Sequence, residues 1–439
     1  MTAVGIDDIV SFGSSLPATG LALCRSCGAP LAHVVADLGM TPISNAFVRA
    51  DRSSSSERFY PLKAFVCDRC WLVQLQDFEA PETHFHGEYV YFSSFSDSWL
   101  AHARSYVDMA IARFNLGRTS RVVEVASNDG YLLQHFVKAG IACLGVDPAA
   151  NCAKAAWDLR GVPTEVAFFG SETARRLREH GGAADLLIAN NVLAHVPDIN
   201  DFVAGFKVLL AERGVITFEF PHVLEMIRNV EFDTIYHEHY SYLSLLALEP
   251  LFARHGLEVI DVERLPTHGG SLRLFVTHAG STAPAKAVEA MRREESADGL
   301  DDIATYKAFA DRVRALKRRL LQMLIHLTEA GHSIAAYGAP AKGNTLLNYC
   351  GIGRDFIDFT VDRNVHKQGL LLPGTRIPVL APDEIARRRP DCILILPWNL
   401  RDEIIAQINR IPGWSGRFIV PVPEPALLDS RGKPDWSAV

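Results

Sequence analysis

Apolar runs of strand length recur in two separate parts of the chain, alternating with segments of helical periodicity. Because parallel strands need crossover connections, this alternation predicts parallel sheets with helices packed on them, and hence an α/β fold with two Rossmann-like domains. In the first part the runs lie at residues 121–126, 141–146, 185–189 and 214–220, with a helix at residues 131–139. In the second part they lie at residues 333–337, 356–361, 391–396 and 417–420.

A long amphipathic helix is predicted between the two series, after a charged stretch at residues 292–298. Its apolar positions, three or four residues apart, include Phe309, Val313, Leu316, Leu320 and Leu324. Residues before the first series alternate short apolar stretches with turns. The 439 residues are enough for about three domains. We therefore expect a small module at residues 1–82, a central domain at 83–285 and a C-terminal domain at 286–439.

The N-terminal module contains two Cys-x-x-Cys pairs, Cys24 with Cys27 and Cys67 with Cys70. Four thiolates at this spacing predict a tetrahedral zinc site. No position on the metal is left open for water, so the zinc is expected to be structural. Two disulfides, or four unrelated buried cysteines, are the alternative; nothing else in the chain resembles a secreted protein.

The composition and net charge of the chain argue against some classes of binding partner. The chain is 48% hydrophobic and 22% charged, with a net charge of −7, which is typical of a globular protein and argues against nucleic acid or an anionic membrane surface as the main partner. Asp7 and Asp8 interrupt the position of a signal-peptide core, and no apolar run approaches the roughly 18 residues of a membrane span. We expect a cytoplasmic protein without a membrane partner.

The turn after the first strand of the central domain retains one glycine, Gly130. A dinucleotide-binding turn has several glycines, so an NAD-like ligand is the weaker alternative. Glu124, at the end of that strand, suits a cationic ligand, and Asp147, at the end of the next, can accept hydrogen bonds from both ribose hydroxyls. These features predict S-adenosylmethionine, which carries a sulfonium and no phosphate.

Three histidine-containing segments are further candidates. His195 follows a strand end, where open α/β sheets bind ligands, although a lone histidine is often structural. The segment from Tyr236 to Tyr240 reads Tyr-His-Glu-His-Tyr; its histidines lack HExxH spacing, which favours a general acid/base cluster over a second metal. The loop that begins at His268 either approaches a ligand with its backbone or is a plain turn between strands.

These segments together resemble the sugar C-methyltransferases that act on nucleotide-linked 4-keto deoxysugars at C3. The resemblance covers essentially the whole chain. It is carried by the four cysteines and by residues 124–130, 190–195, 236–239, 268–273, 337–344 and 396–399. It implies a zinc-binding module, a central S-adenosylmethionine domain and a C-terminal Rossmann-like domain.

The resemblance also assigns residues. The residues implied to bind S-adenosylmethionine are Glu124, Ser127, Asn128, Gly130, Asp147, Asn190 and Asn191. Those implied to bind the nucleotide sugar are Tyr89, Tyr91, His237, His268, Tyr337, Lys342, Asn344, Trp398 and Asn399. One of the two N-terminal tyrosines would cap the site. Lys342 lies in a strand–turn–helix segment suited to a pyrophosphate, without the ending of a Walker A loop; an empty relic of a dinucleotide fold is the alternative there.

The reaction implied is C-methylation through an enolate. A 4-keto group acidifies the C3 hydrogen; His239 would be the base, with Glu238 and Tyr236 beside it. His195 or Tyr236 would donate to the enolate oxygen. The alternatives are O- or N-methylation of a sugar, a zinc-ribbon binding module with an inactive methyltransferase-like body, and, least favoured, a zinc hydrolase. The nucleotide, the C2 and C3 substituents, the stereochemistry and the oligomeric state are not evident from the sequence.

Overall fold

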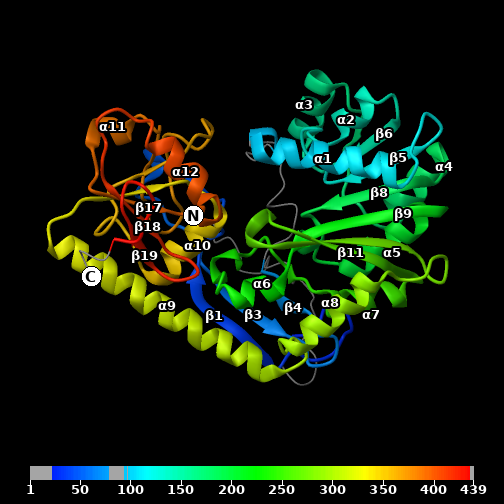
Figure 1. Cartoon of the computed structure of the whole chain (residues 1–439), viewed down its shortest axis with the longest axis horizontal. Helices are drawn as coiled ribbons and strands as arrows, with labels where there is room; N and C mark the ends of the chain where they lie inside the picture. The colour runs from blue at the N-terminus through cyan, green and yellow to red at the C-terminus, as the bar shows by residue number, and fades with distance from the viewer. Residues whose placement is uncertain (1–21, 79–92, 96, 436–439) are drawn as a thin grey trace, which may run out of the picture.

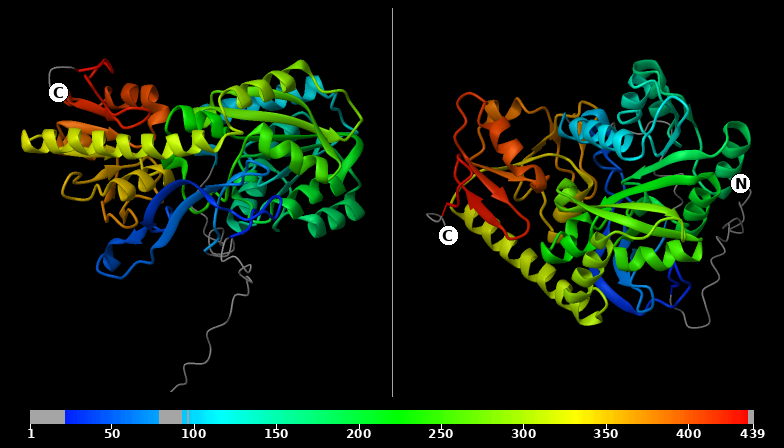
Figure 2. Two further views of the ribbon diagram at one scale, coloured as in Figure 1. Left: turned by 90° about the horizontal axis from the view of Figure 1, so that it is seen from below. Right: turned by 45° about the vertical axis from the view of Figure 1, so that its right-hand side comes forward.

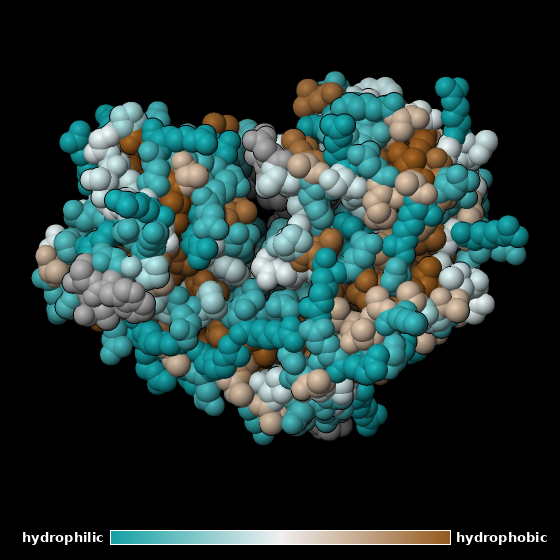
Figure 3. Space-filling view, viewed as in Figure 1, coloured by the Kyte–Doolittle hydropathy of each residue, from teal (hydrophilic) through white to brown (hydrophobic). Residues whose placement is uncertain are grey.

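The computed structural model describes residues 22–78, 93–95 and 97–435, and it contains two α/β lobes joined by a third, smaller sheet (Figure 1). The N-terminal strands (blue) and a long helix (yellow) lie beneath both lobes. Figure 3 shows that the surface is hollowed between the lobes. None of the helices within the described ranges is long and apolar enough to cross a membrane.

The right-hand lobe in Figure 1 is built on a seven-stranded sheet with the order β11-β12-β9-β8-β5-β6-β7. The strands from β5 to β9 run parallel, whereas β12 is antiparallel to both neighbours. Because β5 lies between β6 and β8, strand order reverses there, and ligands bind at such a switch point. The bounds are β5 Arg121–Val125, β6 Ala142–Val146, β7 Thr164–Glu165, β8 Ala184–Asn190, β9 Leu210–Pro221, β11 Leu257–Leu265 and β12 Ser271–His278.

Helices cover both faces of this sheet, as the sequence predicts. Two of these helices, α5 and α7, begin where a polar side chain satisfies a free backbone N–H group: Asp198 accepts from the N–H of Asp201, and Ser244 from that of Ala247. The helices of this lobe are α1 Asp97–Arg113, α2 Leu133–Lys138, α3 Ala150–Arg160, α4 Ser171–Gly181, α5 Ile199–Leu209, α6 Val223–Arg228, α7 Leu245–Arg254 and α8 Lys286–Ala297. Short 3-10 turns are η3 Ser93–Phe95, η4 Leu193–His195, η5 Phe232–Thr234 and η6 Thr267–Gly269.

The C-terminal lobe has a six-stranded sheet in the order β16-β14-β13-β17-β18-β19, parallel except for β19. Three of the expected apolar runs form strands β13, β17 and β18, whereas in the run at residues 356–361 only Thr360 and Val361 form a strand, β14, and residues 356–359 lie outside it. The bounds are β13 Ile334–Tyr337, β14 Thr360–Val361, β16 Val379–Leu380, β17 Cys392–Ile395, β18 Arg417–Val420 and β19 Ala426–Leu428. Its other elements are α10 Ala341–Cys350, α11 Glu384–Arg388, η7 Trp398–Leu400 and α12 Arg401–Ile408.

Three connections join the parts into one molecule. The N-terminal sheet consists of β1 His33–Thr41, β3 Tyr60–Val66 and β4 Val73–Leu75, and its fourth strand is β10 Ser241–Tyr242 from the central domain. Another N-terminal strand, β2 Val48–Arg49, pairs with β15 Leu370–Leu371 of the C-terminal lobe. The short 3-10 turn η1 Ala50–Arg52 follows β2.

The long helix α9 Ile303–Glu329 lies along β1 (Figure 2) and shares a hydrophobic core with it. All five apolar positions predicted for this helix are buried. The segment between α6 and β10, which contains Tyr236 to His239, therefore lies where all three parts meet.

Candidate active site

The four predicted zinc ligands converge. Two sulfur pairs, Cys24 with Cys70 and Cys27 with Cys67, lie 3.5 Å apart, and all four sulfurs lie within 4.8 Å of one another. Zn–S bonds of about 2.3 Å place tetrahedral sulfurs about 3.8 Å apart, so the cluster fits the metal. None of the eight cysteines forms a disulfide, which is evidence against the disulfide alternative.

The local chain explains this convergence. Each Cys-x-x-Cys pair lies on a tight turn closed by backbone hydrogen bonds, Gly28 N–H to the Cys24 carbonyl and Trp71 N–H to the Cys67 carbonyl. Both Gly28 (φ 74°) and Trp71 (φ 59°) have left-handed backbones. The Gln74 amide also donates to the Cys24 sulfur (3.1 Å), as expected of a group that supports a thiolate ligand. Within the described residues, this is the one group with metal-binding geometry; His237 and His239 form no second one.

The carboxyl ends of β5 and β6 carry a buried acidic pocket. Asp147 accepts hydrogen bonds from the N–H groups of Asn128 and Ala149 (both 2.8 Å), and burial raises its pKa to about 6. Burial raises the pKa of Glu124 well above its usual value, and the nearby charges of Asp147 and Asp129 raise it further. Glu124 Oε2 has no hydrogen-bond partner among the described residues. A cationic ligand with hydroxyl groups would satisfy these carboxyl groups.

The backbone of the turn that follows β5 has a conformation that lets a ligand come close to it. Asn128 and Gly130 have positive φ angles of 50° and 75°, and Ser127 is buried against Gly145, where an added Cβ would overlap the Ser127 hydroxyl. At the end of β8, Asn191 is also left-handed (φ 53°). Both polar side-chain atoms of Asn191, and Oδ1 of Asn190, are buried without partners among the described residues. Buried polar atoms are nearly always paired, so these atoms mark a ligand site. S-adenosylmethionine fits it.

A charged network at the edge of this pocket is not predicted from the sequence. Glu219, at the end of β9, is buried and accepts from His102 Nε2 (2.8 Å) and from the Arg273 guanidinium (2.7 Å). Despite burial, these two partners hold the pKa of Glu219 below its usual value. The Trp99 ring stacks on His102 with ring centres 4.9 Å apart and lies 5.3 Å from the ring of His268. The only signal for Glu219 in the sequence is a carboxylate inside an apolar strand.

Tyr236 and His239 form a close pair at the junction of the three parts. The Tyr236 hydroxyl and His239 Nε2 are 2.6 Å apart, and His239 Nδ1 is 2.9 Å from the Thr234 carbonyl oxygen. A carbonyl oxygen only accepts, so Nδ1 carries the proton and Nε2 accepts from Tyr236. Burial lowers the pKa of His239 well below its usual value, and His195 lowers it further. The imidazole is therefore neutral and able to accept a proton at Nε2.

His195 lies near both the Tyr236–His239 pair and the end of β8, where Asn190 and Asn191 lie. It follows Asn190 and Asn191 at the end of β8, and its ring centre is 4.6 Å from that of His239. His195 Nδ1 donates to the Glu238 carbonyl (2.7 Å).

The alternating side chains of the same segment point elsewhere. Glu238 accepts from the Asn45 amide (3.0 Å to each oxygen), and burial raises its pKa to about 7. His237 donates to the Pro61 carbonyl (3.2 Å), and its ring lies 5.9 Å from that of Tyr60. Both therefore contact the N-terminal module.

The C-terminal lobe contributes residues to the same junction. Lys342, in the first turn of α10, donates to Asn399 Oδ1 (2.7 Å) and lies 4.5 Å from the centre of the Trp398 ring. The Trp398 indole N–H donates to Asp233 Oδ2 (2.7 Å), one residue before Thr234. Asn344 Oδ1 is buried without a partner among the described residues, whereas the Tyr337 hydroxyl donates to Gln407 (2.8 Å). Tyr89 and Tyr91 lie outside the described residues.

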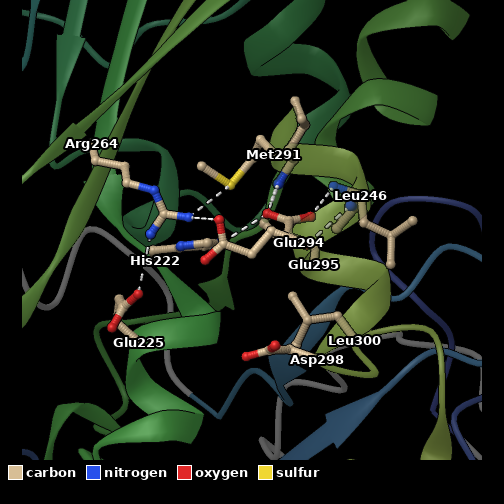
Figure 4. A network of polar contacts seen from close by, with 12 residues as sticks. His222, Glu225, Leu246, Arg264, Met291, Glu294, Glu295, Asp298 and Leu300 are labelled. Atoms are coloured by element: carbon tan, nitrogen blue, oxygen red, sulfur yellow. Dashed lines mark hydrogen bonds and ion pairs between the residues drawn. The ribbon is translucent and has the colours of Figure 1, made fainter. Parts of the chain in front are cut away.

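A buried carboxylate, that of Glu295, joins α8 to α7 and to His222, the residue before α6 (Figure 4). Glu295 of α8 accepts from His222 Nε2 (2.8 Å) and from the first two N–H groups of α7, those of Leu245 (2.8 Å) and Leu246 (2.7 Å). The neighbouring Glu294 pairs with Arg264 of β11. Because α6 begins directly after His222, these contacts set the position of the segment that leads to His239.

Comparisons with known proteins agree with this arrangement. Family models match in chain order: a zinc binding domain at residues 24–85, a methyltransferase domain at 99–262 and a C-methyltransferase C-terminal domain at 266–423. The chain is 39% identical over 409 residues to the C-methyltransferase NovU of Streptomyces niveus, which covers 93% of this chain and 97% of the relative.

The solved structures of two methyltransferases are similar to less than half of the chain. A methyltransferase from Anabaena variabilis is 12% identical, with a TM-score of 0.33, and covers 40% of this chain and 85% of its own. A magnesium protoporphyrin IX methyltransferase from Synechocystis, solved with bound SAH, is 14% identical, with a TM-score of 0.33, and covers 41% and 83%. From the match to NovU and the three family models, the chain belongs to the zinc-containing, S-adenosylmethionine-dependent C-methyltransferase family.

Proposed function

We propose that this enzyme methylates C3 of a nucleotide-linked 4-keto deoxysugar through an enolate, in the cytoplasm. The observation that carries the proposal is the contact between Tyr236 and His239. The Thr234 carbonyl accepts from Nδ1 of His239 and so fixes the tautomer of its imidazole. A carbon next to a ketone must lose a proton before it can attack a methyl group, and a neutral buried imidazole is a suitable base. The family resemblance of the sequence supports the sugar and the position.

In this mechanism His239 Nε2 takes the C3 proton, either directly or through the Tyr236 hydroxyl. The C–H electron pair forms the enolate double bond, and the ketone oxygen takes up the negative charge. When bound, S-adenosylmethionine supplies an electrophilic methyl group. The electron pair at C3 would then form the new carbon–carbon bond as the methyl–sulfur bond breaks, with S-adenosylhomocysteine as the leaving group. The ring centre of His195 is 4.6 Å from that of His239, and His195 follows the end of β8 by a few residues, which supports proximity of the two substrates.

The cofactor, the nucleotide sugar and the zinc would each bind in a different part of the molecule. The acidic pocket of Glu124 and Asp147, with the unpartnered amides of Asn190 and Asn191, would hold the cofactor. The nucleotide sugar would lie in the hollow between the lobes. The zinc site would brace the N-terminal module and would take no part in the chemistry, because four thiolates fill its coordination.

The test uses thymidine- and guanosine-diphosphate 4-keto-6-deoxyhexoses in deuterated water. With S-adenosylmethionine, we expect mass spectrometry to detect one added methyl group and NMR to place it on C3. With S-adenosylhomocysteine in its place, we expect deuterium to enter C3 of the unreacted sugar. Methylation of oxygen or nitrogen without exchange at C3 would refute the enolate route and favour the O- or N-methyltransferase alternative. Neither methylation nor exchange would exclude these sugars as acceptors.

A further inference from the structure

The proposed enolate needs a hydrogen-bond donor at its oxygen, and the tautomers of the two histidines restrict which group can supply it. In both His195 and His239, Nδ1 donates to a backbone carbonyl. A neutral imidazole has one N–H, so Nε2 of His239 is an acceptor, as is Nε2 of His195 in its neutral form. Two imidazoles with centres 4.6 Å apart are not both cationic, because like charges this close repel. The Tyr236 hydroxyl already donates to His239.

Lys342 is a strong donor at this junction. Its ammonium group has three N–H bonds, of which one is directed to Asn399 Oδ1 (2.7 Å). The Trp398 ring, 4.5 Å from the nitrogen, covers one side of the cation. Trp398 is itself held by its bond to Asp233 (2.7 Å), so the lysine is attached to the same short segment that carries the Thr234 carbonyl. Lys342 is partly buried, and its bond to Asn399 leaves two N–H groups for a ligand.

Direct contacts connect this ammonium to the segment of the base: Trp398, which lies 4.5 Å from it, bonds to Asp233, and the next residue, Thr234, accepts from His239. Lys342 lowers the pKa of both His239 and His268, after the larger effect of burial. Burial lowers the pKa of Lys342 itself, and Asp233 and Glu231 oppose that shift. The two carboxyl groups therefore help to keep the lysine charged in a partly dehydrated site.

We propose that Lys342 stabilises the enolate oxygen during proton removal, rather than binding the pyrophosphate of the nucleotide. The inference rests on the proposed function, because it requires an enolate. It assigns the C-terminal lobe a part in the chemistry: the base comes from the central domain, and the opposing cation comes across the hollow from α10. Such a site is complete only when both lobes are in place.

The experiment compares Lys342→Met with wild type and with Lys317→Met. Lys317 is a matched control, since it also lies 4.5 Å from an aromatic ring, that of Tyr349, and contacts a backbone carbonyl. We expect Lys342→Met to lower kcat about 100-fold. Solvent exchange at C3 should fall equally, while KM for the nucleotide sugar changes less than about threefold, because the lost interaction develops in the transition state. Lys317→Met should keep wild-type rates.

Three results separate the possibilities. A rise in KM above about tenfold with kcat retained would show that Lys342 binds ground-state substrate and would overturn the inference. Exchange at the wild-type rate in Lys342→Met would also overturn it. Methylation by wild type without exchange would refute the proposed function itself. If Lys342→Met folds poorly, Lys342→Ala is assayed with added ethylammonium: saturable rescue, absent with tetramethylammonium, supports the inference, and no rescue opposes it.

Discussion

Replacement of Glu295 by alanine is a sharp test of how the junction beneath the active site is held. Glu295 is fully buried and accepts from three donors: His222 Nε2 and the N–H groups of Leu245 and Leu246. The substitution leaves all three without their acceptor, and an unsatisfied buried donor costs about 1–3 kcal/mol. We therefore expect a loss of about 4 kcal/mol in the free energy of unfolding.

The assay is thermal unfolding with zinc and S-adenosylhomocysteine held at saturation. For a cooperative unit of 150–250 residues, about 1 kcal/mol shifts Tm by about 2–4 °C, so a decrease of roughly 10 °C is expected. Glu295→Gln, which keeps one acceptor oxygen, should lose about half as much. Glu289→Ala is the control on the same helix: its side chain is 56% exposed, and exposed ion pairs contribute less than about 1 kcal/mol. A Tm for Glu295→Ala within 2 °C of wild type would refute the reasoning.

Three further predictions concern the metal, the base and pH. Cys24→Ser should lower both bound zinc, measured by elemental mass spectrometry, and Tm, because metal binding is coupled to folding; a stable, metal-free variant would contradict the zinc site. His239→Ala should reduce methyl transfer by about 10³-fold while calorimetry shows S-adenosylhomocysteine affinity within about twofold of wild type; normal turnover would mean that another group is the base. Burial raises the pKa of Glu238 from 4.5 to about 7, so its contribution to stability is full below pH 4.5 and is lost as pH rises through 7. Tm measured from pH 5 to 8 should fall, and Glu238→Gln should flatten that profile; an unchanged slope would show that Glu238 does not titrate there.

The sequence pattern was sufficient for the features that local chemistry governs. Apolar runs located most of the buried strands, and a period of 3.6 residues located α9, because burial of apolar faces is a local property of each element. The knuckles of Cys24 and Cys67 were recognisable because ligand spacing on a tight turn is encoded within four residues. The acidic strand ends at Glu124 and Asp147 followed from the rule that ligands bind where parallel strands end.

Long-range contacts decided the rest. Neighbours in one segment diverge: His239 faces Tyr236 and His195, whereas Glu238 faces Asn45 of another module. The backbone carbonyls that fix the tautomers of the histidines depend on the packing of η5 and η4, which no residue spacing reveals.

The sequence by itself therefore determined the elements, the metal ligands and the acidic strand ends, because these depend on neighbours a few positions away. The tertiary structure decided which groups meet at the junction. Glu219 is paired with Arg273 across 54 positions of the chain, and Lys342 is brought beside a base about 100 residues away in sequence only because β10, α9 and α10 pack the three parts against one another. Charge, burial and hydrogen-bond direction at an active site are properties of that packing.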